Sequence, residues 1–225
     1  MRMLSAAVGR TKIRRPHAER SAETREKILR AACQCIAEFG FSNSSMLGIA
    51  TRAGVSLGAV QHQFGDKDAI IDAVIDRCLR EFSGLLTGLR QAEPNLQRRV
   101  QTFTERAWLG HTGPYYRIVL DILLHCPDRT ERLAAAHTKL WAEIFGDLKL
   151  PARQLLAAQR FTFMMLGGIA LESALVPGVE PAKEHFAVLE RTLLGRLTGV
   201  DRTQRVALGA RRGGKVRRQT PRKGV

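Results

Sequence analysis

The side chains of this sequence that could do chemistry are six histidines, four cysteines and a run of polar residues between Ser56 and Gln63. Catalysis needs a nucleophile beside a base, a pair of acid and base groups, or metal ligands at a fixed spacing. The sequence contains no HExxH, no CxxC and no glycine-rich phosphate loop. We therefore expect no catalytic site, no metal site and no cofactor.

The cysteines, at positions 33, 35, 78 and 126, are expected to be reduced thiols of a cytoplasmic protein. Cys33 and Cys35 lie two positions apart on an expected helix, so they point to different faces and are badly placed to pair with each other. Cys78 falls on an apolar helical stripe, which predicts a buried and inert thiol. Cys126 is the one cysteine that we would test for redox activity.

Residues 40–71 predict two short helices joined by a tight turn. Ala53–Val55 supplies the turn, with Gly54 where the chain needs a left-handed residue. Ser56 is a natural N-cap for the second short helix, which turns Val60 and Phe64 inward. The outward side of this helix is left with Leu57, Ala59, Gln61, His62 and Gln63. A helix of this kind can enter the major groove of DNA and present its exposed residues to base edges.

The net charge of +15 is concentrated at the two ends of the chain. Residues 1–20 carry six Lys or Arg and one acid, and residues 201–225 carry nine and one, which leaves the body nearly neutral. Basic arms of this kind attract phosphate backbones, or else anionic lipid. The N-terminal arm could follow the DNA backbone or enter a minor groove. The C-terminal tail has almost nothing to bury, so we expect it to be disordered.

The rest of the chain predicts an all-α fold, because apolar residues recur at helical spacing and strand signals are nearly absent. The longest apolar run, Phe161–Leu171, is half the length needed to span a bilayer, so no membrane partner is expected. The pattern predicts about nine helices, at residues 22–39, 45–53, 56–64, 66–89, 96–109, 115–125, 130–145, 152–175 and 181–197.

The order of residues in Ile28–Ile71 resembles the DNA-binding domain of the TetR family of repressors. The resemblance rests on Phe39-Gly40-Phe41, then Ser-Ser-Met, Ile-Ala, Ala-Gly-Val-Ser-x-Gly-x-Val, Phe64 and Lys67, at fixed spacing without a gap. It implies a repressor that binds a palindromic operator in double-stranded DNA as a homodimer and is released by a small-molecule effector. The implied layout is a basic arm at 1–20, a three-helix helix-turn-helix domain at 21–68, a helical ligand-binding and dimerisation domain at 69–199, and a basic tail at 200–225.

The resemblance also implies a set of DNA-contacting residues. They are Ser44, Ser45, Ser56, Leu57, Ala59, Gln61, His62 and Lys67. Among them, Ser44, Ser45 and Lys67 would hold phosphates, and the residues from Leu57 to His62 would face the groove. Gln61 replaces an aromatic residue common in the family, and it could bond a phosphate or read adenine. Leu57 replaces a common lysine, a loss that the basic N-terminal arm could offset.

Larger aromatic, histidine and methionine side chains of the C-terminal region are the candidates for an effector pocket, although each also suits an ordinary core. They are Trp108, His111, Tyr115, Tyr116, His125, Trp141, Phe161, Phe163, Met164 and Met165, with Glu172 as a further polar group. They favour a hydrophobic effector. The resemblance implies that the last two long helices form a four-helix bundle with those of a second copy, where Gly167-Gly168 could allow close approach or simply pack in the core.

Two other functions remain open at this point. The basic tails would also suit an architectural DNA-binding protein without an effector. A thiol sensor using Cys126 or Cys78 is the second alternative. The sequence identifies neither the operator nor the effector, and it does not separate a repressor from an activator.

Overall fold

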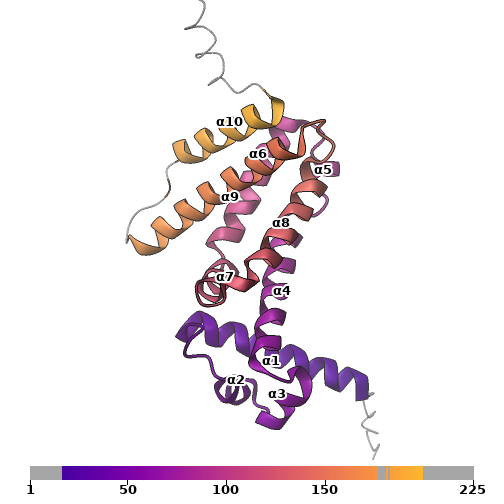
Figure 1. The fold of residues 1–225 in the computed structure, drawn as a ribbon, viewed down its shortest axis with the longest axis vertical. Helices are drawn as coiled ribbons and strands as arrows, with labels where there is room; N and C mark the ends of the chain where they lie inside the picture. The colour runs from indigo at the N-terminus through magenta and orange to yellow at the C-terminus, as the bar shows by residue number, and fades with distance from the viewer. Residues whose placement is uncertain (1–16, 177–180, 182, 200–225) are drawn as a thin grey trace, which may run out of the picture. The chain divides into compact units, whose positions relative to one another are not determined.

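A computed structural model describes residues 17–176, 181 and 183–199. These residues form ten α-helices and one turn of 3-10 helix, with no strand among them (Figure 1). The all-α prediction is therefore confirmed. The helix that sequence reasoning missed is α5, a single turn at Leu89–Ala92. It arises because Gly88 adopts φ +75°, which ends α4 (Lys67–Leu86) and redirects the chain.

The chain divides into two compact units. The first contains the described residues up to Cys78 together with Arg117–Pro127, and the second contains Leu79–Tyr116 and the residues from Asp128 onward. Two helices therefore belong to both units by continuity of the chain: α4 and α7 (Pro114–His125). Most of the predicted N-terminal arm and the whole C-terminal tail lie outside the described residues, and α1 begins at His17.

The first unit is built from α1 (His17–Phe39), α2 (Met46–Ala53), α3 (Leu57–Phe64) and the start of α4. Its core is a set of fully buried aliphatic side chains contributed by every one of these helices and by α7. Members of this core are Ile28, Ala32, Ile36, Ile49, Val60, Ile70, Ile71, Val74, Ile118 and Ile122. The predicted helical periodicity thus places each apolar stripe inward.

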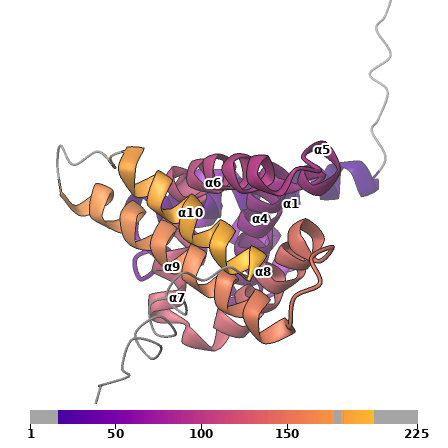
Figure 2. The same ribbon diagram turned by 90° about the horizontal axis from the view of Figure 1, so that it is seen from above.

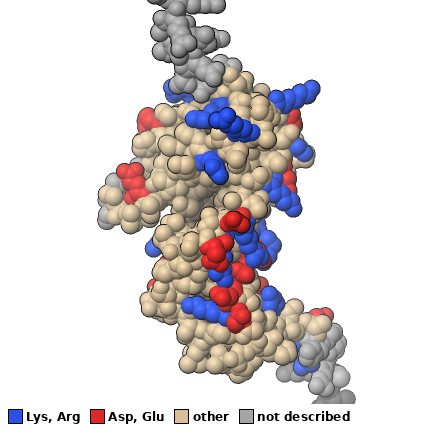
Figure 3. Space-filling model, viewed as in Figure 1, with Lys and Arg blue, Asp and Glu red and all other residues tan. Residues whose placement is uncertain are grey.

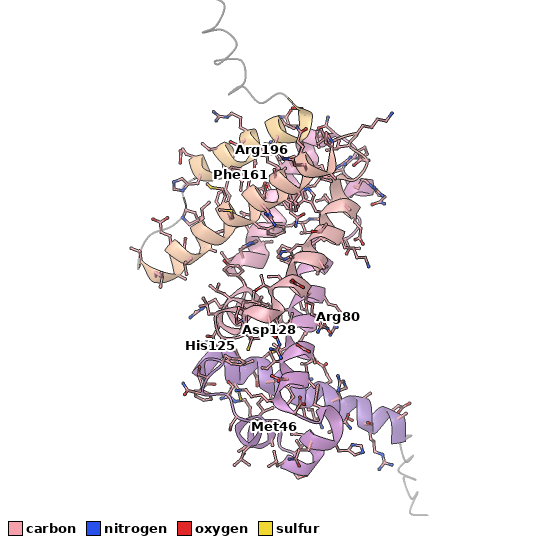
Figure 4. The ribbon with its side chains drawn as sticks, in the orientation of Figure 1. Met46, Arg80, His125, Asp128, Phe161 and Arg196 are labelled. Carbon is pink, nitrogen blue, oxygen red and sulfur yellow. The ribbon has the colours of Figure 1, made fainter. Side chains whose placement is uncertain are left out.

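The second unit contains α6 (Leu96–Thr112), α8 (Thr130–Phe145), α9 (Ala152–Leu175) and α10 (Lys183–Thr198). Helices α6, α9 and α10 pack against one another, and Figure 2 shows α10 lying along both of its neighbours. The core of this unit includes Phe103 of α6 and Trp141 and Phe145 of α8, and the Phe103 and Trp141 rings lie edge to face with their centroids 5.2 Å apart. Figure 4 shows Phe161 of α9 beside Arg196 of α10, whose guanidinium lies 4.6 Å from the ring centroid.

The core of the second unit contains one buried arginine among its described residues. Arg99 of α6 is 3% exposed. Its guanidinium donates to the Ile144 carbonyl at 3.0 Å, to the Glu93 carbonyl at 2.8 Å and to the Asp147 carboxylate at 2.7 Å. The side chain thus satisfies carbonyls at the end of α8 and at the break before α6.

None of the helices in the described part of the chain combines the length and the apolar character needed to cross a bilayer.

Candidate nucleic-acid interface

The turn between α2 and α3 has the geometry that the sequence predicted. Gly54 adopts φ +67°, and the Val55 amide donates to the Ala50 carbonyl at 3.1 Å. Each of the two helices begins with a serine cap: the hydroxyl of Ser45 accepts the Gly48 amide at 3.0 Å, and that of Ser56 accepts the Ala59 amide at 3.1 Å. These local contacts build a helix-turn-helix.

The outward side of α3 is largely exposed to solvent. Val60 and Phe64 are buried, whereas Leu57, Gln61 and His62 are exposed and Ala59 is half-buried. This arrangement can present a carboxamide, an imidazole and two apolar groups to the edges of bases.

Gln63 has a different role from the outward one that sequence reasoning assigned to it. Its side-chain amide donates to the hydroxyl of Ser21 at 2.9 Å. The carbonyl of Gln63 accepts a hydrogen bond from Arg25 at 2.8 Å, and the Arg25 guanidinium lies 4.0 Å from the centroid of Phe64. These contacts tie the end of α3 to α1 and hold the helix in position.

The surface of α2 and α3 carries little charge, and Figure 3 shows it largely tan. Helix α3 contains no Lys, Arg, Asp or Glu, and Arg52 of α2 is paired with Glu38 at 2.5 Å. Base contacts from α3 would therefore depend on hydrogen bonds and apolar packing. The long-range attraction to phosphate would come from other parts of the chain.

The predicted phosphate contacts differ in accessibility. Ser45 is exposed, whereas Ser44, which was predicted to contact phosphate, is 2% exposed and its hydroxyl donates to the Gly40 carbonyl at 2.8 Å. Ser44 turns inward because it closes the turn before α2. Lys67 is half-buried, with its ammonium donating to the Phe41 carbonyl at 3.2 Å and lying 4.4 Å from the Phe41 ring centroid. An ammonium has three donors, so Lys67 keeps two for other acceptors.

The same turn has a partner that sequence reasoning missed. The carboxylate of Asp121 accepts the Phe41 amide at 2.6 Å, across a separation of 80 residues. No local pattern marks Asp121, because the contact depends on how α7 packs against the end of α1.

The second unit brings some of the predicted effector residues together. His111 and Tyr116 have ring centroids 4.8 Å apart, and Phe163 lies 6.0 Å from His111 and 6.2 Å from Trp141. His137, which sequence reasoning did not single out, stacks on Phe163 at 4.2 Å. We call these five residues, together with Phe82, the aromatic–histidine cluster.

The other candidates lie apart from this cluster. Trp108 contacts Phe186 of α10 at 5.1 Å, and Phe161 contacts Arg196. Met164 is 75% exposed and Glu172 is exposed, so neither faces the interior of this unit. Tyr115 and Met165 are half-buried, and Met165 packs on the hydrophobic core. His125 belongs to the first unit, where its ring stacks on Phe41.

The cluster is polar but uncharged at neutral pH. Burial lowers the pKa of His111, and burial together with the charge of His111 lowers the pKa of His137 to about 4. The indole N–H of Trp141 is buried without a hydrogen-bond partner. A ligand placed here would meet aromatic faces, neutral imidazoles and one free donor, which suits an apolar molecule with a hydrogen-bond acceptor.

A separate hollow of about 320 Å³ lies where α4, α5 and α8 meet. Its floor is formed by Leu86, Leu89 and Ile144, and its rim includes Arg90 and Glu143. None of the predicted effector residues lines it.

All four cysteines are free thiols, and Cys126 is half-buried. Cys33, Cys35 and Cys78 are buried, as predicted for Cys78. The thiols of Cys33 and Cys78 hydrogen-bond to each other, and this contact and burial raise the pKa of Cys78, so this thiol stays protonated. Within the described residues, no three His, Cys, Asp or Glu side chains converge in a way that could hold a metal ion.

Comparison with known proteins finds similarity to bacterial regulatory proteins. Residues 28–74 match the family described as bacterial regulatory proteins, tetR family. The chain is 28% identical over 162 residues to the HTH-type transcriptional regulator BetI of Stenotrophomonas maltophilia, covering 68% of this chain and 83% of that one. It is 26% identical over 192 residues to BetI 2 of Chromohalobacter salexigens, covering 77% and 87%.

Solved structures with the same fold include two TetR-family regulators. The protein from Marinobacter aquaeolei superposes with a TM-score of 0.62 at 16% identity, over 80% of this chain and 97% of its own. The protein from Mesorhizobium loti superposes with a TM-score of 0.60 at 21% identity, over 80% and 98%. At these identities the likeness concerns the fold.

Proposed function

We propose that this chain is a DNA-binding transcriptional regulator of the TetR type and not an enzyme, and that it is a repressor that binds a palindromic operator as a homodimer and is released by a small molecule. The observation that carries the proposal is the exposed face of α3. This helix follows a glycine turn, begins with the serine cap Ser56, and exposes Leu57, Gln61 and His62. In this proposal these three residues and Ala59 read bases, while Ser45, Ser56 and Lys67 contact phosphates. Ser44 has no place in this set because its hydroxyl is buried.

The proposed dimer face is formed by α9 and α10. Their exposed side chains include Leu156, Met164, Leu171, Leu175 and Val188, and Met164 and Leu175 are 75% and 70% exposed. Apolar side chains that gather on two neighbouring helices indicate a surface that another chain covers. Gly168 supports this interpretation, because a Cβ there would meet no atom within 4 Å, so the exposed helix backbone is open to a close neighbour. Two-fold symmetry would then match two operator half-sites.

The proposed effector is an apolar or aromatic molecule with at least one hydrogen-bond acceptor. It would bind at the aromatic–histidine cluster, where its acceptor would receive a hydrogen bond from the indole N–H of Trp141. The cluster is closely packed, with ring centroids 4.2 to 6.2 Å apart, so binding would displace side chains. That displacement gives the effector a means to favour one state of the protein over another.

The test is recovery of genomic DNA fragments on the purified full-length protein at ~150 mM salt, where non-specific binding is weak. We expect a shared palindrome upstream of a few genes. A Gln61→Ala, His62→Ala variant is the matched control, because it keeps every charged residue and should lose the palindrome. If the wild type recovered random fragments, the repressor proposal would be refuted. The basic ends of the chain would then support an architectural role.

A further inference from the structure

Two buried thiols of the first unit, on different helices, contact each other. Cys33 of α1 and Cys78 of α4 are 7% and 2% exposed, and their side chains hydrogen-bond to each other. An ion pair at 2.5 Å between Glu26 of α1 and Arg77 of α4 joins the same two helices (Figure 1). We call Cys33 and Cys78 the thiol pair.

The two members of the thiol pair differ in acidity. The hydrogen bond from the Cys78 thiol lowers the pKa of Cys33 although burial opposes it, and the charge of the Arg77 guanidinium lowers this pKa further. The same hydrogen bond and burial raise the pKa of Cys78. Cys33 is therefore the thiol that ionises more readily, and it is also the more exposed of the two. Cys78 is placed to react with Cys33 once Cys33 has been oxidised.

Cys35 lies two residues from Cys33 on the same helix but faces α2. It is 3% exposed and lines a hollow beside Leu47 and Thr51. Burial raises the pKa of Cys35, so this thiol stays protonated at neutral pH. Cys35 is thus a natural internal control, a buried cysteine of the same helix that lies on another face.

We propose that Cys33 and Cys78 are an oxidation site, which a hydroperoxide converts into an intrachain disulfide. The Cys33 thiolate attacks the O–O bond of the hydroperoxide and becomes a sulfenic acid, while the proton that it gave up goes to the departing alkoxide or hydroxide. The Cys78 sulfur then attacks the Cys33 sulfur, and the Cys78 proton leaves with the hydroxyl group as water. Two thiols and one hydroperoxide thereby give one disulfide, one alcohol or water, and one further water. Two electrons pass from the sulfurs to the peroxide oxygens.

The disulfide closes a loop around the helix-turn-helix. Residues 34–77 lie between the two cysteines and contain the whole of α2 and α3. A disulfide holds its sulfurs about 2.05 Å apart, closer than hydrogen-bonded thiols lie, so α1 and the adjoining part of α4 must draw together. Helix α1 also positions α3, because Ser21 and Arg25 both bond Gln63. Oxidation should therefore shift α3 and weaken operator binding, a consequence that rests on the proposed function.

The experiment treats the purified full-length protein with hydrogen peroxide, blocks the remaining thiols with iodoacetamide and maps disulfides by mass spectrometry without reduction. Trypsin places Cys78 on the peptide 78–80 and Cys33 on the peptide 31–52, so the disulfide joins two peptides that are separate in sequence. We expect this linked species to form with peroxide and to disappear with dithiothreitol.

Matched variants identify the cysteines that react. Cys35→Ala should still form the linked species, and Cys33→Ala should not. Cys78→Ala in the Cys35→Ala background should stop at a sulfenic acid, which dimedone traps on the peptide 31–52. A link through Cys35, or oxidation of the half-buried Cys126 while the thiol pair stays reduced, would overturn the inference.

Fluorescence anisotropy then measures operator affinity before and after oxidation. We expect the crosslinked protein to bind about tenfold more weakly, the effect of losing about one base contact, and to recover on reduction. Cys33→Ala should keep its affinity in peroxide. Unchanged affinity of the crosslinked protein would refute the effect on DNA binding. A wild type without a specific operator would refute the proposed function alone, because the peptide mapping needs no DNA.

Discussion

The clearest test of the second unit's architecture is removal of its buried guanidinium. Arg99→Met keeps the apolar stem of the side chain and deletes the guanidinium with its donors. In the native protein those donors satisfy the carbonyls of Ile144, Glu93 and Pro94 and the carboxylate of Asp147. The substitution therefore leaves acceptors at two helix ends without partners.

The expected magnitude follows from the exposure of each partner. The Ile144 carbonyl is in a buried contact, and an unsatisfied buried acceptor costs about 1–3 kcal/mol. The Glu93 and Pro94 carbonyls lie in partly buried contacts and together add about 1 kcal/mol. The Asp147 side chain is 39% exposed and regains water, so its loss adds less than about 1 kcal/mol. We expect the free energy of unfolding to fall by about 3 kcal/mol.

Urea denaturation followed by tryptophan fluorescence is the appropriate assay. The chain has two tryptophans, Trp108 and Trp141, and both lie in the second unit, so the signal reports on that unit. Asp147→Asn removes only the exposed carboxylate charge and should cost less than about 1 kcal/mol. The reasoning would be refuted if Arg99→Met stayed within about 0.5 kcal/mol of the wild type, or if Asp147→Asn were equally damaging.

Three further predictions concern the turn, the interface and the titration of the cluster. Gly54→Ala should destabilise the first unit by about 1–2 kcal/mol, because an added Cβ meets no neighbour and the cost is that of the left-handed backbone alone. Gly54→Asn should cost less, since asparagine adopts this conformation more readily. Thermal denaturation followed by circular dichroism measures both, and equal values for the two variants would contradict the backbone explanation. Lys67→Ala should weaken binding to all DNA sequences and lower the slope of log affinity against log salt concentration by about 1. Gln61→Ala should instead relax the base preference at one or two operator positions. Identical binding profiles for the two variants would refute the division between phosphate and base contacts. The folded pKa of His137, about 4, lies below its ordinary value of 6.5, so the unfolded chain takes up the proton first and stability falls by about 3 kcal/mol as pH drops from 6.5 to 4. His137→Phe should flatten this part of the pH profile of unfolding, and an unchanged slope would show that His137 titrates normally.

The sequence alone determined the helix-turn-helix and every helix except α5, because the interactions that specify them are local. Serine caps act over three residues, the left-handed glycine acts within one turn, and an apolar stripe repeats every three or four positions. The family resemblance rested on the same local residues. For this reason Gly54, Ser56 and the exposed face of α3 could be identified from spacing alone.

Tertiary packing decided the contacts that no local pattern encodes. The inward turn of Ser44 depends on the path of Gly40, and the role of Gln63 depends on Ser21 of another helix. Asp121 meets Phe41 across 80 residues, and a carboxylate on a helix surface carries no sign of its partner until the helices pack. Periodicity says which face of a helix is buried, but the partner across that face is chosen by the shapes of whole helices fitting together, and this is why α7 joins the first unit only in the folded structure.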